Sequence, residues 1–593
     1  MATDGRAGGA RRLITGLLAG VGCLTLAFFS IAIIAAVTAM RGEQLPDQVI
    51  LELDLHGGLI ESAPEDVVGS ILNRSRLSVH DVVDALKRAE SDERVTGLIA
   101  RVTADLELAQ AEELRDAVTS FRASGKPAIV FSETFGESGP GRGGYYFATA
   151  FEEIDLQPSG DLGLAGFIAE TPFFGGTLEL LGVEPQMDQR YEYKNALNTL
   201  IDEEMGDAQR EATGRVLESF LENLVAGIAE GRDLDAQRVR TLIDNGPYPA
   251  QEALDAGLVD RLAYRDEAYD SLQARVGGEF VTVDAYLENV GRPNRSGPTI
   301  ALIYGTGTIQ LGESQMSPLG GGAVMGAETV ANAFHEAVES DAVRAILFRV
   351  DSPGGSYVAS DKIWHEVERA RAAGKPVIVS MAGVAGSGGY FVAMGADRII
   401  AHPSTITGSI GVYGGKMLIG ELSEKLGVTW DDVRVGGNPT MWSTVEPYSE
   451  AESAKMQASL DRIYADFTEK AARGRGLSAD STHAVARGRI WTGVDALRIG
   501  LVDELGGFAT ALRAVREEAG LEPDAPVRVR VFPQPRTLVE MILEPRSNEG
   551  YQTALGQALR GSAAVGRVVD GLARAGVLSG EGALLMPGLP IVP

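Results

Sequence analysis

Short apolar runs alternate with longer amphipathic stretches along most of the chain. Residues 94–102 and 342–350 each form an apolar run that follows a helical pattern, which is typical of a buried strand. Longer helical stretches occupy about residues 208–232 and 450–473. This alternation predicts parallel βαβ units with right-handed crossovers, and the expected fold class is therefore α/β.

The same pattern occurs twice in the sequence. Segment 94–102 aligns with 342–350, and a Lys-Pro pair begins the next strand of each half at Lys126 and Lys375. The later matching blocks are 141–145 with 386–390, 158–159 with 403–404, and 253–260 with 496–503. Repetition over this length predicts a tandem of two related domains.

The repeat also gives the expected domain boundaries. The first α/β repeat is placed at 47–290 and the second at 298–535, with a Gly/Pro-containing linker at about 288–298. Residues 536–593 form a C-terminal tail to which no role is assigned. A helix is expected within this tail at about 551–575.

The amino-terminal segment is predicted to cross a membrane. Residues 13–40 contain no charged side chain, and at roughly 1.5 Å per residue they exceed the roughly 30 Å of a bilayer core. Residues 1–12 carry three arginines and should stay cytoplasmic, so the rest of the chain should face outward. A signal peptide cleaved near 36–39 is the alternative, but the apolar run is longer than the usual core of about 7–15 residues.

Composition excludes several classes of function. The net charge of −29 disfavours non-specific binding to nucleic acid or to an anionic lipid surface. Cys23 is the single cysteine and lies inside the predicted anchor, so no disulfide or cysteine nucleophile is expected outside it. No metal or cofactor is expected.

Ser387 is the candidate nucleophile. It lies between the predicted strand 377–381 and a helical pattern, and glycines flank it within 385–393. A serine on such a strand-to-helix turn exposes its hydroxyl, and the amides that follow point toward the group it attacks. This geometry suits acyl transfer, although a glycine-rich turn that merely caps a helix is the alternative.

A second glycine motif is expected beside this serine. Residues 351–356 follow the neighbouring strand 345–350 and should reach the same edge of the sheet. The N–H groups of Gly355 and Gly388 are therefore predicted to form a two-donor oxyanion hole. Asp351 is interpreted as a capping residue.

The residues alone leave the general base open. His402 is the only one of six histidines close to Ser387 in sequence, and it precedes a proline that should end a strand. A lysine could serve if burial lowered its pKa enough to leave it neutral. By itself, however, the local pattern around Lys194 is typical of a solvated lysine at the start of a helix.

The block 385–412 and the motif 193–196 resemble the signal peptide peptidase A family in its long bacterial form, a family of Ser/Lys peptidases within the Clp-protease/crotonase superfamily. The resemblance extends from the anchor to about residue 536. It implies that Lys194 is the base of Ser387 and that Ser409 orients the lysine. It also implies a homotetramer in the bacterial inner membrane, with its catalytic domain facing the periplasm, that degrades cleaved signal peptides.

The two repeats differ at the positions that matter for chemistry. The first carries Arg142 where the second carries Ser387, and Leu164 where the second carries Ser409. The second has no lysine at 435–441, the counterpart of the Lys194 region. One composite site per chain is expected, so the chain is predicted to be a membrane-anchored serine endopeptidase that acts on apolar peptides. A catalytically inactive membrane scaffold and a crotonase-like acyl-CoA enzyme are the alternatives.

Overall fold

The computed structural model of the chain describes residues 45–61, 77–103, 106–137, 139–316, 323–533 and 584–585. Within these ranges, no helix combines the length and apolar character needed to cross a membrane. The predicted anchor at 13–40 and the helix expected at 551–575 lie outside the described residues.

The first half is built on a six-stranded parallel sheet in the order β8-β4-β3-β2-β1-β9. Its strands are β1 (Val49–Asp54), β2 (Val95–Arg101), β3 (Ala128–Ser132), β4 (Glu153–Leu156), β8 (Arg261–Leu262) and β9 (Glu279–Thr282). Its helices are α3 (Val79–Ser91), α4 (Leu108–Ala123), α5 (Arg142–Ala148), α9 (Ala236–Asn245), α10 (Ala250–Asp255), α11 (Arg265–Val276) and α12 (Val283–Val290). A two-stranded antiparallel pair, β5 (Asp161–Leu162) and β7 (Tyr248–Pro249), lies beside this sheet.

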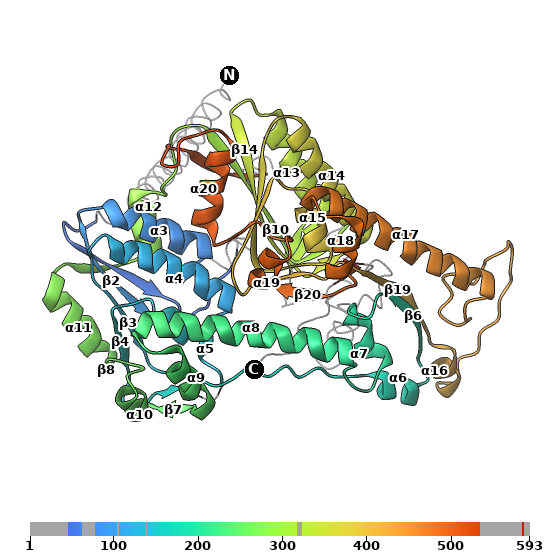
Figure 1. The fold of residues 1–593 in the computed structure, drawn as a ribbon, viewed down its shortest axis with the longest axis horizontal. Helices are drawn as coiled ribbons and strands as arrows, with labels where there is room; N and C mark the ends of the chain where they lie inside the picture. Colours follow the sequence, from blue (N-terminus) through green and yellow to red (C-terminus); the bar gives the residue numbers. More distant parts are fainter. Residues whose placement is uncertain are drawn as a thin grey trace, which may run out of the picture.

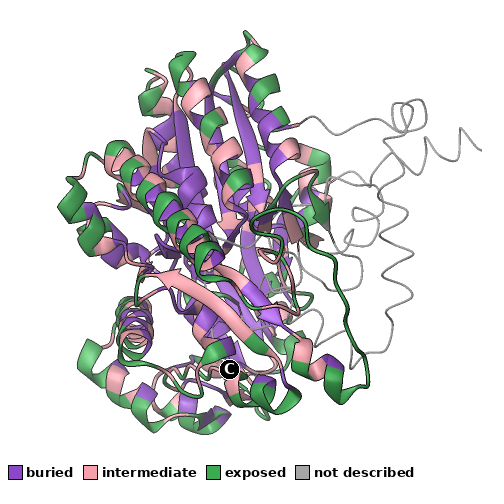
Figure 2. Ribbon diagram, turned by 90° about the vertical axis from the view of Figure 1, so that its right-hand side faces the viewer, coloured by how far each residue is buried: buried purple, intermediate pink, exposed green. Residues whose placement is uncertain are grey.

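The second half repeats the plan with an eight-stranded sheet whose main order is β20-β18-β16-β14-β10-β22, with β17 and β21 branching from β16. Its strands are β10 (Thr299–Thr306), β14 (Val343–Ser352), β16 (Val377–Gly386), β17 (Arg398–Ala401), β18 (Ile406–Gly408), β20 (Ile490–Thr492), β21 (Glu504–Leu505) and β22 (Arg528–Phe532). Its helices are α13 (Ala327–Glu339), α14 (Tyr357–Ala372), α15 (Gly388–Ala393), α18 (Ala479–Val485), α19 (Gly493–Arg498) and α20 (Phe508–Glu518). Figure 2 shows the central strands buried between helices whose outer faces are exposed, which explains why the strands are near-continuous apolar runs.

An equivalent hydrogen bond occurs within each half. The hydroxyl of Tyr145 donates to the carbonyl oxygen of Leu258 at 2.7 Å. In the second half, the hydroxyl of Tyr390 donates to the carbonyl oxygen of Leu501 at 3.0 Å. These two hydrogen bonds join residues of the sequence blocks that align between the halves. The prediction of an α/β fold in two related repeats is confirmed.

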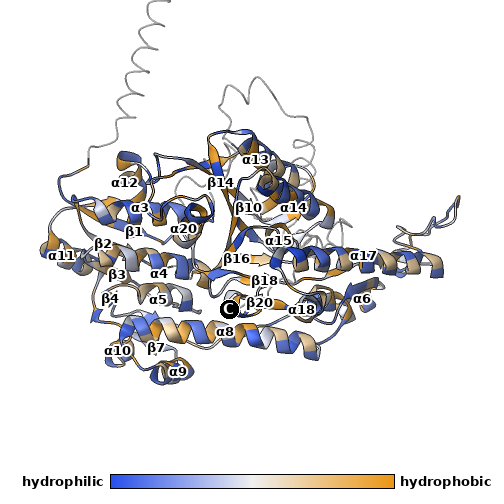
Figure 3. Ribbon diagram, turned by 45° about the horizontal axis from the view of Figure 1, so that its top comes forward, coloured by the Kyte–Doolittle hydropathy of each residue, from blue (hydrophilic) through white to orange (hydrophobic). Residues whose placement is uncertain are grey.

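Two long helices extend from the sheets. Helix α8 (Asp207–Arg232) runs across the lower part of the molecule in Figure 1, beneath the sheets of both halves, and α17 (Glu450–Arg475) extends to its right-hand side. Apolar and polar residues alternate along α8 in Figure 3, as expected for a helix with one buried face. Helix α8 joins the halves through Ser219, whose Oγ lies 2.8 Å from Thr492 Oγ1.

A small sheet formed by both halves lies close to the candidate site. Strand β6 (Glu184–Arg190) of the first half pairs antiparallel with β19 (Val412–Leu418) of the second, with Arg190 opposite Val412. Helices α6 (Gly175–Leu181), η1 (Asn195–Leu197), α7 (Asn198–Ile201) and α16 (Gly420–Lys425) lie next to these strands along the chain. Strand β6 leads directly toward Lys194, and β19 begins just after Ser409.

A third sheet has the order β12-β13-β11-β15-β23. Its members are β12 (Gln315–Met316), β13 (Ala323–Gly326), β11 (Thr308–Gln310), β15 (Gly354–Gly355) and β23 (Leu584–Leu585). Strand β15 contains Gly355, one of the two glycines of the predicted oxyanion hole.

Candidate active site

Ser387 occupies the turn between β16 and α15. Its backbone has φ 53° and ψ −113°, a sparsely populated conformation for a residue with a side chain. The turn is held because Ser387 N–H donates to Gly408 O at 2.8 Å and Gly386 pairs with Gly408 in the sheet. The strand-to-helix turn predicted from the sequence is present, with the strand extending to Gly386.

Lys194, from the first half, reaches the hydroxyl of this serine. Its Nζ lies 2.7 Å from Ser387 Oγ, 2.9 Å from the carbonyl oxygen of Ser409 and 3.0 Å from Ser409 Oγ. None of the three residues has exposed side-chain surface. The structure thus brings together the three polar side chains singled out from the sequence, although they lie up to 215 positions apart in the chain.

The environment of Lys194 favours its neutral form. Burial alone lowers the pKa of the Lys194 ammonium well below its usual value of 10.5. In the described part of the chain, no carboxylate forms an ion pair with Lys194 that would oppose this effect. A neutral amine can accept a proton, so the arrangement is chemically suited to activating a hydroxyl.

Gly488 makes room for this lysine and was missed by sequence reasoning. It has φ +85°, and a Cβ at this position would lie 2.4 Å from Lys194 N and 2.5 Å from Lys194 Cβ. Its N–H donates to Ile410 O at 2.7 Å, one residue after Ser409. The only available signal was a glycine between Arg487 and Arg489, which is too common a pattern to single out.

The two glycines of the predicted oxyanion hole are adjacent. A Cβ on Gly388 would come within 3.0 Å of Gly355 N, so the backbones of the two residues lie in contact range. Gly355 must itself be a glycine, because a Cβ there would lie 2.1 Å from Ile309 O. The two backbones therefore approach each other directly beside Ser387.

The interpretation of Asp351 as a capping residue is wrong. Asp351 belongs to β14, and its Oδ1 accepts a hydrogen bond from Val384 N at 3.1 Å, whereas the residue that caps α14 is Ser356. The strand continues past the predicted end and carries the carboxyl group into the interior. Burial, with repulsion from Glu61 and Glu107, raises the pKa of Asp351 to about 7.

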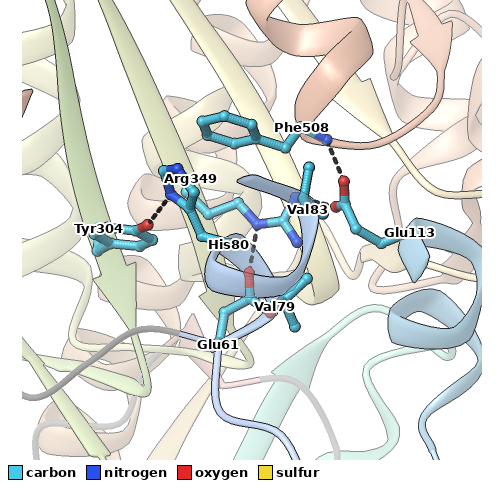
Figure 4. Close-up of a pocket in the computed structure, with 8 residues that line it drawn as sticks. All are labelled: Glu61, Val79, His80, Val83, Glu113, Tyr304, Arg349 and Phe508. Atoms are coloured by element: carbon cyan, nitrogen blue, oxygen red, sulfur yellow. Dashed lines mark hydrogen bonds and ion pairs between the residues drawn. The ribbon is translucent and has the colours of Figure 1, made fainter. Parts of the chain in front are cut away.

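His402 is in a different environment from Ser387. Its Nε2 lies 2.8 Å from Glu113 Oε2, and Arg349 lies 3.1 Å from the same carboxylate. Arg349 also pairs with Glu61 at 2.5 Å, and Figure 4 shows Arg349 between these two carboxylates. Burial opposes ionisation, yet the opposite charges outweigh it: the pKa of Glu113 falls to about 2 and that of His402 rises above 6.5. His402 thus belongs to a buried ion-pair cluster that joins the two halves.

In the first half, other side chains fill the position that corresponds to the Ser387 site. Arg142 is buried, donates to Gly166 O at 2.6 Å and lies with its guanidinium 4.4 Å from the centre of the Phe167 ring. Leu164, the counterpart of Ser409, has no exposed surface. This half contributes a lysine to the other half's serine rather than a second serine.

The two α/β repeats bring the buried side chains of Lys194 and Ser387 into contact, an arrangement suited to a serine hydrolase. Residues 120–278 and 369–522 match the model of Peptidase family S49, one stretch from each half, and the chain belongs to this family. It is therefore a serine protease, and peptides are its substrates.

Curated relatives of the same family match most of the chain. Protease 4 of Salmonella typhi is 32% identical over 460 residues, which cover 75% of this chain and 72% of that protein. The chloroplastic serine protease SPPA of Arabidopsis thaliana is 30% identical over 483 residues, covering 79% of this chain and 70% of that protein. Among solved structures, a ClpP1 mutant from Listeria monocytogenes matches 36% of this chain and 94% of its own, with 17% identity and a TM-score of 0.23.

Proposed function

We propose that this serine protease uses Ser387 as its nucleophile and Lys194 as its general base. The observation that carries the proposal is the 2.7 Å separation between Lys194 Nζ and Ser387 Oγ in a site where burial lowers the pKa of the lysine. A serine hydroxyl is a weak nucleophile unless an adjacent base takes its proton, and a neutral lysine can do so.

The contacts of the amine account for its orientation. A neutral amine has two N–H groups and one lone pair. If the N–H groups donate to the carbonyl oxygen and the Oγ of Ser409, at 2.9 and 3.0 Å, the lone pair faces the Ser387 hydroxyl. Ser409 is thus proposed as the positioning residue of Lys194.

The proposed reaction follows from this arrangement. Lys194 takes the hydroxyl proton as Ser387 Oγ bonds to the scissile carbonyl carbon, and the N–H groups of Gly355 and Gly388 stabilise the resulting oxyanion. Lys194 then gives its proton to the leaving amine as the peptide bond breaks. A water molecule, deprotonated by the same lysine, attacks the acyl-enzyme and releases the second product with Ser387 restored.

We further propose that the enzyme is a single-pass protein of the bacterial inner membrane. The uncharged stretch at 13–40 supports an anchor, and the arginines before it support a catalytic region on the periplasmic side, in repeats bounded at about 47–290 and 298–535. Cleaved signal peptides and other extended apolar peptides are the proposed substrates. Family resemblance supports both this substrate class and a homotetramer.

The test is hydrolysis of a fluorogenic apolar peptide by the full chain in detergent. Ser387→Ala and Lys194→Met should each lose at least about a thousandfold in kcat/KM, because members of a catalytic unit act together. Lys375→Met is the control, because the Lys375 amine is likewise hydrogen-bonded but donates to two backbone carbonyls of the second half, away from Ser387. Full activity in Lys194→Met, with Lys375→Met unchanged, would exclude the lysine as base.

A further inference from the structure

Arg489 joins the two halves close to the proposed dyad. Its guanidinium carbon lies 5.0 Å from the centre of the Tyr193 ring of the first half and 4.4 Å from the centre of the Trp491 ring of the second. Nη1 of the same guanidinium lies 2.8 Å from Glu211 Oε1 on α8, and the hydroxyl of Tyr193 donates to Glu211 Oε2 at 2.7 Å. These four residues form one cluster, which we call the Arg489 cluster.

The contacts of this cluster are of kinds that hold a guanidinium in place. Hydrogen bonds from Tyr193 and Arg489 lower the pKa of Glu211 below its usual value of 4.5, so the carboxylate is ionised at neutral pH. A planar guanidinium is also attracted to the faces of aromatic rings. Because the Glu211 side chain is 54% exposed, solvent weakens the ion pair and leaves much of the hold on Arg489 to the two rings.

The Arg489 cluster adjoins both Lys194 and the serine that contacts its amine. Tyr193 directly precedes Lys194, and the carbonyl oxygen of Arg489 accepts a hydrogen bond from Ser409 N–H at 2.7 Å. Ser409 Oγ in turn lies 3.0 Å from Lys194 Nζ. The side chain of Arg489 therefore binds the segment that carries the lysine, while its backbone binds the segment that carries Ser409.

We infer that Arg489 is a positioning residue for the proposed catalytic centre, where it holds the Lys194 segment of the first half against the Ser409 segment of the second. This inference rests on the proposed function, because it takes Lys194 to be the base of Ser387. Without the arginine side chain the two segments can shift apart, and water can reach an amine whose pKa is lowered by burial alone. The pKa of Lys194 should then rise, and the enzyme should need a higher pH to keep its base neutral.

The matched control for this arginine is Arg265, the first residue of α11, which lies at the left-hand end of the molecule in Figure 1. Its guanidinium carbon lies 4.9 Å from the centre of the Tyr269 ring, and both side chains contact the carboxylate of Glu52. Arg265 thus belongs to the same kind of cluster, formed within the first half alone.

The kinetic test compares Arg489→Met with Arg265→Met in the full chain in detergent. Arg489→Met should lower kcat about 10- to 100-fold with KM within about twofold of wild type, because a base misplaced by about 1 Å has effects of that size. The acidic limb of its pH profile for kcat/KM should move up by at least about 0.5 pH unit. Arg265→Met should match wild type in kcat and in the pH profile. A normal kcat and an unmoved limb in folded Arg489→Met would overturn the inference.

Glu211→Gln is a milder change to the same contact, because the side chain is half exposed and the substitution keeps its size. It should lower kcat about two- to fivefold, since Arg489 loses its ionic partner but keeps both rings. The double variant should lose little more than Arg489→Met alone, because the two side chains act through one contact. Losses that simply multiply would show that the two residues act separately and would overturn the inference.

A measurement without catalysis separates this inference from the proposed function. In a Ser387→Ala background, the Ser409 amide, which is bonded to Arg489 O, should exchange its hydrogen faster in Arg489→Met than in Arg265→Met. Faster exchange, in an enzyme that Lys194→Met leaves fully active, would keep the Arg489 cluster as a structural contact and reject the proposed function. Unchanged exchange, kcat and pH profile in Arg489→Met, with activity lost in Lys194→Met, would reject the inference alone.

Discussion

The backbone of Gly488 lies so close to Lys194 that a Cβ at residue 488 would be 2.4 Å from the backbone nitrogen of the lysine. The residues on either side of Gly488 hold the residue before Lys194 and the serine that contacts the Lys194 amine. Arg487 O accepts a hydrogen bond from Tyr193 N at 3.2 Å, and Arg489 O accepts one from Ser409 N at 2.7 Å. This loop of the second half therefore sets the position of a lysine that belongs to the first.

Gly488→Ala should lower kcat/KM about a hundredfold, because a methyl group would push Lys194 away from Ser387 and displacements of about 1 Å can have effects of that size. Peptide hydrolysis measures the loss, and circular dichroism checks that the chain is folded. Gly500→Ala is the control: Gly500 has a similar φ of +79°, but its Cβ would have only an ordinary 3.5 Å contact with Leu477. Equal losses in both variants would point to backbone strain rather than to the lysine.

Lys194→Met should abolish cleavage and raise the melting temperature at pH 7. The folded-state pKa of Lys194 lies well below 10.5, so between the two pKa values the unfolded chain binds more protons than the folded one. The wild-type lysine therefore costs stability that is recovered as the pH rises toward 10.5. Thermal unfolding from pH 6 to pH 10 should show the advantage of the variant shrinking with pH, and an advantage independent of pH would contradict this account.

Ser409→Ala should lower kcat about 10- to 100-fold without abolishing activity. The substitution removes the Oγ contact of Lys194 Nζ at 3.0 Å but keeps the backbone carbonyl contact at 2.9 Å, so the amine loses one of two orienting partners. Steady-state kinetics should show KM almost unchanged. Ser423→Ala, which removes a hydroxyl bonded only to Ile419 O within the described residues, should behave as wild type.

His402→Gln should keep peptidase activity per folded molecule, since His402 pairs with Glu113 rather than with Ser387. The pKa of His402 is raised in the folded chain, so its contribution to stability is complete below about pH 6.5 and is lost as the pH rises through the folded value. Urea unfolding should give a difference between wild type and variant that is constant from pH 5 to 6.5 and declines above. Loss of activity in a folded variant would make His402 part of the catalytic centre.

Removing the Glu113 carboxylate that pairs with His402 should lower the free energy of unfolding more than removing the histidine. Glu113→Gln leaves His402 and Arg349 buried without their shared carboxylate, at a cost of about 3–5 kcal/mol in unfolding free energy. The pKa of Glu113 is lowered to about 2, so the wild type loses this contribution as the pH falls below about 4.5. Urea unfolding at pH 6 and pH 3 should therefore give a large and a small difference, respectively. Glu218→Gln, which alters a surface pair with Arg240, is the control.

Short sequence patterns predicted those parts of the candidate site that are formed by residues close together in one half. The turn at Ser387 follows from glycines between an apolar strand and a helix, and the glycine pair at Gly354–Gly355 follows from the next strand of the same sheet. Both motifs lie in one half, so βαβ geometry alone brings them together.

The remaining features depend on contacts between segments that are distant in sequence. Nothing near Lys194 is apolar enough to predict a fully buried amine, because the residues that cover it come from the second half. Only the resemblance to a family singled out this lysine. The need for glycine at 488, the interior position of Asp351 and the pairing of Leu584 with Gly355 are likewise set by the packing of remote segments.

The pairing of β6 with β19 also has a consequence for biosynthesis. Lys194 follows β6 and is translated early, whereas Ser387, Ser409 and β19 emerge from the ribosome about two hundred residues later. A nascent chain that has exposed only its first repeat holds the proposed base without the proposed nucleophile. Under the proposed mechanism, proteolytic competence arises only after both repeats have been made and have docked, so synthesis of the enzyme includes an interval in which it cannot cleave itself or neighbouring proteins.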